Sequence, residues 1–116
     1  MDKNELKERT KAFAHNCVKI ALGLQNNYLD NHIKGQLIRC STSVASNYRA
    51  ACLAQSKAAF ISKVSIVIEE ADESDFWLEF IADEKLLPFE DVADLKNEAH
   101  QLTSIFISTR MTAQGK

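Results

Sequence analysis

The chain contains one proline and three glycines among its 116 residues. Because these residues serve most tight turns, their scarcity excludes a fold of many short strands and favours a few long helices. Long apolar runs are also missing, since no stretch approaches the roughly 20 apolar residues of a membrane span. The first residues, MDKNELKERTK, are charged and do not resemble a targeting segment. We therefore expect a soluble, cytoplasmic, all-α protein with no membrane partner.

Sequence signatures of catalysis and metal binding are missing as well. The chain has no HExxH, no CxxC, no nucleophile elbow and no glycine-rich phosphate loop. His100 follows Glu98 by two positions, whereas a di-iron Glu-x-x-His pair needs three, and His15 and His32 have no partner at helical spacing. The acidic run at 69–73 has no histidine on its face and fits a solvated or salt-bridged surface better than a metal site. We predict no enzyme activity, no catalytic, metal-binding or cofactor-binding residue and no cofactor.

The cysteines are odd in number and fall inside helical patterns. Cys17, Cys40 and Cys52 therefore fit small core thiols in a reducing compartment better than disulfide partners.

Apolar and small positions recur at spacings of three and four in four segments, which run over residues 4–26, 31–54, 56–85 and from Pro88 toward Gly115. Asn31 and Ser56 are expected N-caps, and Pro88 fits the first turn of the last helix. The inward stripe of the second segment consists of Ile33, Leu37, Cys40, Val44, Asn47 and Ala51, and the stripes of the other three segments include Phe13, Val64 and Phe106. Short turns between helices predict an antiparallel up-down-up-down four-helix bundle, with residues 1–116 as a single domain.

The third segment is apolar beyond the stripe that a four-helix core requires. A helix that is apolar on several sides should be buried on several sides, and another subunit supplies that burial most simply. We expect a homo-oligomer whose interface candidates are Ile66, Phe76, Trp77 and Phe80.

A turn near Ala54 predicts which residues of the second and third segments lie at the same height. It sets Arg39 beside Glu70 and Gln36 beside Glu73, and both pairs would be polar contacts between helices. Asn47 has two readings: a solvated or capped amide, or a buried amide that fixes the register of the helices.

Charge is segregated along the chain. Residues 31–68 contain no acid, whereas residues 69–98 contain twelve acids against two lysines. Such blocks either pair with each other inside a bundle or face different partners. The cations of the first block are Lys34, Arg39, Arg49, Lys57 and Lys63. Arg49 lies opposite the core stripe and Lys57 at an exposed helix start, so these two are the freest to meet a phosphate.

Several stretches together resemble a known family. They are RTKAFA near the start, QLIRCSTSVASNYRAA, SKAAFISKVSIVIEEADESDFWL and the closing LKNEAHQLTSIFIST. Over nearly the whole chain they are similar to the four-helix-bundle proteins encoded by intervening sequences of 23S ribosomal RNA genes. One position departs from the family pattern: Ala50 stands where the family often has a glutamate after Asn-Tyr-Arg, so any polar contact of that glutamate is missing here.

The resemblance implies an antiparallel four-helix bundle assembled as a ring-like homopentamer, with no established biochemical activity. The chain also looks like the accessory proteins of diversity-generating retroelements, which are pentameric bundles that bind nucleic acid and a reverse transcriptase. Two function classes remain open. One is an oligomeric module that binds RNA or another nucleic acid through Lys34, Arg49, Lys57 and Lys63. The other is a scaffold for a protein partner, or a selfish-element product without nucleic-acid binding.

Overall fold

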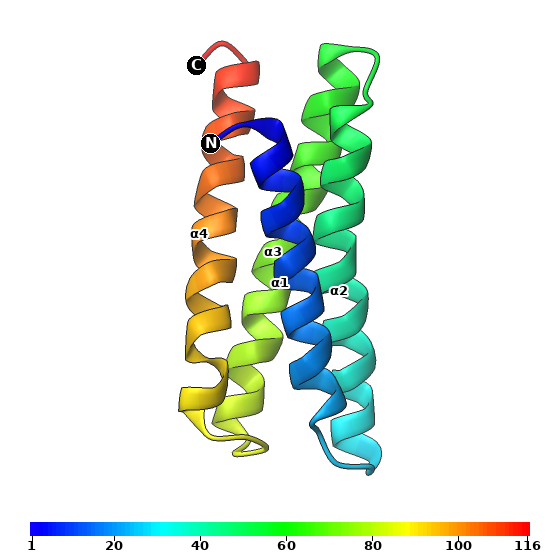
Figure 1. The fold of residues 1–116 in the computed structure, drawn as a ribbon, viewed down its shortest axis with the longest axis vertical. Helices are drawn as coiled ribbons and strands as arrows, with labels where there is room; N and C mark the ends of the chain where they lie inside the picture. Colours follow the sequence, from blue (N-terminus) through cyan, green and yellow to red (C-terminus); the bar gives the residue numbers. More distant parts are fainter.

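Four helices make up nearly all of the chain in the computed structural model, which describes all 116 residues. They are α1 (Lys3–Leu22), α2 (Tyr28–Cys52), α3 (Lys57–Asp83) and α4 (Phe89–Ala113). Consecutive helices run in opposite directions, with the α1–α2 and α3–α4 turns at one end and the α2–α3 turn at the other (Figure 1). The predicted all-α class and four-helix bundle are confirmed.

Side-chain caps mark where α1, α2 and α3 begin, and before α1 the Asp2 carboxylate accepts a hydrogen bond from the Glu5 amide at 2.8 Å. The Ser56 hydroxyl accepts a hydrogen bond from the Ala59 backbone amide at 3.0 Å, which confirms the predicted cap of α3. The predicted cap of α2 is wrong: Asn27, not Asn31, accepts from the Asp30 amide at 2.9 Å. Pro88 stands one position before its predicted place and caps α4 without a side-chain hydrogen bond.

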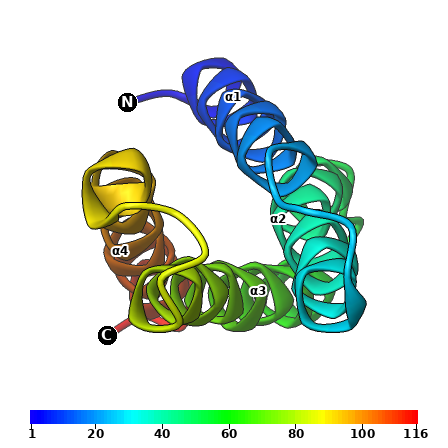
Figure 2. The same cartoon turned by 90° about the horizontal axis from the view of Figure 1, so that it is seen from below.

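The bundle is an elongated rod of 45 × 20 × 20 Å. α1 packs far more extensively on α2 than on α4, and the end-on view shows α1 and α4 splayed apart (Figure 2). Arg9 of α1 spans this side, because its guanidinium donates two hydrogen bonds of 2.7 Å to the Glu98 carboxylate of α4. The first and last helices are thus held together largely by a charged pair.

The core follows the predicted stripes except at one point on α2. Phe13, Val64 and Phe106 are almost completely buried, as the spacing predicted. Asn47 was expected inward, but Tyr48 occupies that level of the core and packs its ring on Phe106, with centroids 5.0 Å apart. The buried residue of α2 at this level is therefore Tyr48 and not Asn47, since burying the tyrosine ring removes more apolar area from water than burying an amide.

No helix combines the length and the apolar character that crossing a membrane requires.

Candidate nucleic-acid interface

The polar seam between α2 and α3 centres on Arg39. Its guanidinium donates to Glu70 at 2.9 Å and also binds Glu73, while its Nε donates to the Gln36 amide oxygen at 3.3 Å. The structure therefore brings all four predicted residues together, with one difference. Gln36 and Glu73 are linked only through Arg39, because the longer arginine side chain donates hydrogen bonds to both of them. The Arg39 guanidinium is thus fully engaged by contacts within the chain.

The Glu73 carboxylate has two donors. Besides Arg39, the indole Nε1 of Trp77 donates to it at 3.1 Å. Partial burial raises the pKa of Glu73, but the hydrogen bonds from Arg39 and Trp77 outweigh that effect, so the net pKa is below its ordinary value. The same contact with Glu73 raises the pKa of Arg39. Both groups are charged at neutral pH, and the seam is a fixed structural contact.

Asn47 does not join this seam. It is half-buried, and its amide donates to the Ser43 carbonyl at 3.0 Å and to the Ser43 hydroxyl at 2.8 Å, both on the same helix. Because no hydrogen bond links it to another helix, the register-fixing reading is wrong within the subunit. The reading as an amide satisfied by its own helix describes the structure.

A second charged cluster ties α3 to α4. The Lys96 ammonium donates to Asp75 at 2.6 Å and to Glu79 at 3.3 Å. Partial burial lowers the pKa of Lys96, and the hydrogen bonds to the two carboxylates raise it further than burial lowers it. Together with Arg9 and Arg39, three of the fourteen cations are thus committed to internal pairs. The other cations make no salt bridge within the subunit.

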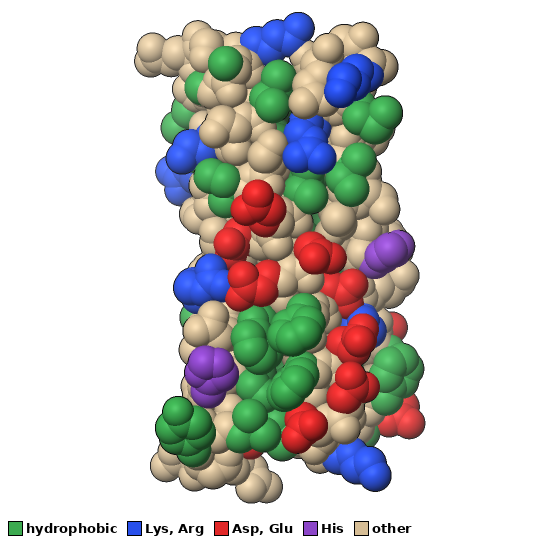
Figure 3. All heavy atoms as spheres, turned by 180° about the vertical axis from the view of Figure 1, so that it is seen from behind, with side chains coloured by type: hydrophobic (Ala, Val, Ile, Leu, Met, Phe, Trp, Pro, Cys, Tyr) green, Lys and Arg blue, Asp and Glu red, His purple; other side chains and the backbone are tan.

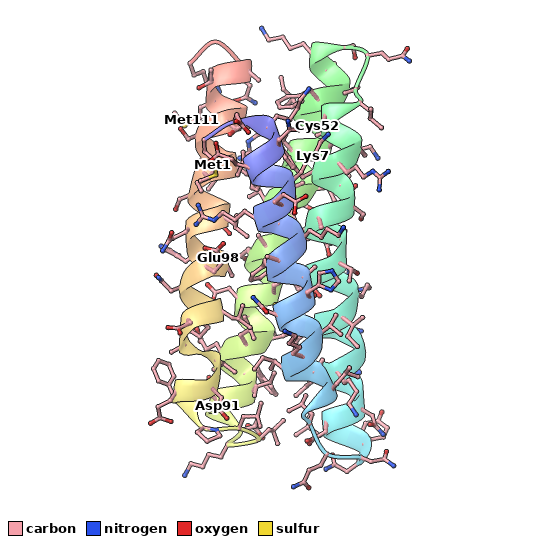
Figure 4. The ribbon with its side chains drawn as sticks, in the orientation of Figure 1. Met1, Lys7, Cys52, Asp91, Glu98 and Met111 are labelled. Atoms are coloured by element: carbon pink, nitrogen blue, oxygen red, sulfur yellow. The ribbon has the colours of Figure 1, made fainter.

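Charge divides the rod into two halves. The basic half comprises residues 1–12, 45–66 and 104–116, and it carries nine Lys or Arg against three acids, a net charge of +6. The acidic half, the remainder of the chain, carries five Lys or Arg against thirteen acids, a net charge of −8. Lys7 lies in the upper part of α1, and Asp91 lies at the far lower end of α4 (Figure 4). Pairing between the two charged blocks of the sequence is limited to Arg39 with Glu70 and Glu73. The other reading, in which the blocks face different partners, stays a prediction.

A groove of about 780 Å³ runs between α1 and α2, from the basic half across its boundary to Val18 and Thr42. Its walls carry the unpaired cations Lys7 and Lys11 from α1 and Arg49 from α2, against a single acid, Glu8. The remaining lining residues are Ala14, His15, Val18, Thr42, Ala45 and Ser46. The three unpaired cations can neutralise a phosphate bound in the groove.

The candidate phosphate contacts from the sequence are only partly brought together. Arg49 is exposed and lines the groove. Lys57 is exposed at the start of α3, in the basic half, whereas Lys63 is half-buried one and a half turns further along. Lys34 is half-buried near the start of α2, whereas Arg49 lies near the end of the same helix. Arg49 and Lys57 are thus the better placed of the four.

Lys7 and Lys11 were not among the candidates. A signal for them exists in the sequence, because Lys3, Lys7, Lys11 and His15 recur at a spacing of four and so lie along one side of α1. They form a cationic groove only together with Arg49 of α2, and the packing of α1 on α2 is needed to show that these three residues lie close together.

An exposed aromatic cluster lies in the acidic half. Phe76 is 53% exposed and stacks edge-on against Trp77, with centroids 5.0 Å apart, and Phe80 and His32 complete the group. Figure 3 shows apolar side chains in the lower half of this face, flanked by carboxylates. Of the predicted interface residues, Phe76 is exposed, whereas Ile66, Trp77 and Phe80 are half-buried.

The thiols show no sign of an activated nucleophile. Cys17 and Cys40 are completely buried, and burial raises the pKa of Cys17 to about 12 and that of Cys40 to about 11. No group of three or more His, Cys, Asp and Glu side chains lies together in a way that could hold a metal ion.

The fold and its surface features define a helical bundle whose polar groups either join helices to one another or form a cationic groove. This chain belongs to the 23S rRNA-intervening sequence protein family, whose model matches residues 2–108. The resemblance seen in the sequence is thereby confirmed. No curated protein matches the sequence significantly.

A solved structure shares the whole fold. It is a protein of unknown function from the S23 ribosomal protein family of Bacteroides thetaiotaomicron, 29% identical in sequence, with a TM-score of 0.85. The match covers 95% of this chain and 98% of that one. Neither comparison indicates a catalytic family.

Proposed function

We propose that this protein is an oligomeric module that binds RNA through the basic half of each subunit. The observation that carries the proposal is the α1–α2 groove, in which Lys7, Lys11 and Arg49 have no internal partner although other cations of the chain do. Unpaired cations that face each other across a groove are the usual means of neutralising phosphates. The family description refers to 23S rRNA, and RNA is therefore the nucleic acid to test first.

The net charge of −2 does not oppose this proposal. At physiological ionic strength the Debye length is about 8 Å, whereas the rod is 45 Å long. Carboxylates at the far end of the acidic half are therefore screened from a phosphate bound in the basic half. An RNA strand responds to the local charge and not to the total, and this charge is +5 once Glu98, the partner of Arg9, is counted with the basic half.

The oligomer is proposed to form through the aromatic cluster, with Phe76 at its centre. A cluster of three large aromatic side chains, one of them mostly exposed, is unusual on a monomer surface and is typical of an interface. The number of subunits rests on the family resemblance, which implies five.

The experiment measures binding of a fluorescently labelled RNA that contains both a stem and single-stranded flanks, at salt concentrations from about 50 mM upward. The test variant is Arg49→Glu/Lys57→Glu, and the matched control is Lys19→Glu/Lys85→Glu, which reverses two exposed lysines of the acidic half. We expect the test variant to bind more weakly and to lower the slope of log affinity against log salt by at least about 1, because each lost phosphate contact removes about 0.7–0.9 of a released counterion.

The control variant carries the same change in net charge, so it separates local contact from general repulsion. Equal loss in both variants would argue against a basic-half site. Absence of RNA binding by the wild-type protein at about 50 mM salt, where electrostatic attraction is strongest, would refute the proposal. It would favour the second candidate, a scaffold whose protein partner docks on the exposed aromatic cluster.

A further inference from the structure

The groove contains cations and small side chains but no Phe, Tyr or Trp, and its one aromatic ring is the imidazole of His15. Its lining residues are four titratable groups from α1, one arginine from α2 and five small or apolar side chains. Proteins that hold single-stranded nucleic acid combine a basic groove with aromatic side chains on which the bases stack, and each stacked base is worth about 1–3 kcal/mol. The groove supplies the first element, and of the second it has only the His15 imidazole.

Exposed aromatic side chains lie in the other half of the rod. Tyr28 is 92% exposed, Phe89 59% and Phe76 53%, and all three belong to the half with a net charge of −8. A strand that stacked its bases there would bring its phosphates among carboxylates. Stacking and phosphate binding are therefore separated in this molecule, whereas a single-strand binder has them side by side.

The aromatic residues of the basic half are not available in the groove. Tyr48 is buried in the core. Phe60 is half-buried and lines a separate hollow with Thr109 and Thr112 of α4, whereas the cationic groove lies between α1 and α2. The end-on view places these two pairs of helices on opposite sides of the bundle (Figure 2).

We infer that the groove binds the phosphate backbone of double-helical RNA and does not bind single strands through their bases. This inference rests on the proposed function and names its ligand class. A site that reads only phosphates favours the ligand with the higher charge density, and a duplex releases more counterions per contact than a single strand, about 0.9 against about 0.7. Recognition of double-stranded RNA through its backbone and shape needs no access to the bases.

The polar neutral residues of the groove agree with this ligand. Thr42 donates its hydroxyl to the Ile38 carbonyl at 2.7 Å, and Ser46 donates weakly to the Ser43 carbonyl at 3.4 Å. Their hydroxyl protons are thus held by the helix, and neither residue offers the paired donor and acceptor that would read a base edge. The groove provides charge and acceptor oxygens, without a means of sequence recognition.

The test compares two labelled ligands of equal nucleotide number on the intact wild-type protein: a perfect RNA duplex, and an unstructured oligouridine. We expect the duplex to bind at least about tenfold more tightly at about 100 mM salt, with a steeper salt dependence. The variant Lys7→Glu/Lys11→Glu should weaken duplex binding at least about tenfold and remove most of the preference, while Lys19→Glu/Lys85→Glu should retain it.

The outcomes separate this inference from the proposed function. Oligouridine that binds as tightly as the duplex, or more tightly, overturns the duplex inference and leaves RNA binding standing. Duplex binding that survives Lys7→Glu/Lys11→Glu overturns the groove as its site. Binding of neither ligand refutes the proposed function itself. Circular dichroism of each variant, with unchanged helix content, ensures that a loss of binding reports the groove and not unfolding.

Discussion

The contact between Arg39 and Glu70 should contribute measurably to stability. Arg39 is 49% exposed at its side chain and Glu70 is 16% exposed, so the 2.9 Å pair lies at the border of the bundle and not inside it. Fully exposed pairs contribute about 0.2–1 kcal/mol. Arg39 also keeps Glu73 when Glu70 is removed. We therefore expect a coupling free energy of about 0.5–1 kcal/mol between Arg39→Ala and Glu70→Ala.

The assay is urea denaturation of the wild type, both single variants and the double variant, at one protein concentration because association shifts apparent stability. Glu69 provides the control, since it is exposed, adjacent to Glu70 in sequence and in no salt bridge. Coupling between Arg39→Ala and Glu69→Ala should stay below about 0.3 kcal/mol. Additive effects of Arg39→Ala and Glu70→Ala would refute the reasoning.

The pH dependence of the seam has a definite sign. Because the folded protein holds the pKa of Glu73 below its ordinary value of 4.5, its pairing with Arg39 stabilises the fold at all pH values above about 4.5. The stabilisation is lost as the pH falls below that value and Glu73 becomes protonated. The coupling of Arg39→Ala with Glu73→Ala should therefore be full at pH 7 and shrink below pH 4.5.

Two further predictions concern assembly and the thiols. Light scattering should find the wild type well above its monomer mass of 13.0 kDa. Phe76→Glu should lower the measured mass more than the control Phe89→Glu, which changes an exposed aromatic residue outside the cluster. A wild-type mass near 13.0 kDa would exclude association through this surface. Cys17 and Cys40 should resist a thiol reagent at pH 8 until the protein unfolds, because burial keeps both protonated. The half-buried Cys52 should react first. Modification of all three cysteines at the same rate in the folded protein would contradict the buried placement of Cys17 and Cys40.

The sequence predicts the bundle well where short-range physics decides it. A short turn near residue 54 and an equal rise per residue in both helices place Arg39 at the height of Glu70, and no other information is needed. The start of α2 is different, because Asn26, Asn27 and Asn31 are all suitable caps. The choice is made by Asp30, whose buried carboxylate accepts the Gln25 amide at 2.9 Å and so fixes the turn before α2.

The candidate site is less predictable than the fold. Periodicity alone does not decide whether Asn47 or Tyr48 faces the core, since spacings of three and four are both helical; the partner ring of Phe106 decides it. In the same way, a spacing of four puts Lys7 and Lys11 on one side of their helix, but this spacing is equally typical of an ordinary solvated face. They become a site only when α1 packs beside α2.

The symmetry of the proposed oligomer bears directly on RNA binding. In a cyclic ring whose rods lie along the symmetry axis, all subunits point the same way, so the basic halves gather on one face and the acidic halves on the other. A two-fold pair with antiparallel rods would instead place the two basic halves at opposite ends, about 45 Å apart. At a Debye length of about 8 Å the antiparallel pair would offer two small, independent sites. A ring gives one continuous cationic surface, on which a duplex can contact several grooves at once. Once one groove has bound, the others are at high local concentration near the duplex, so the overall affinity exceeds that of a single groove. RNA binding that is lost together with assembly in Phe76→Glu, although its groove is intact, would show that the ring and not the single groove is the binding unit.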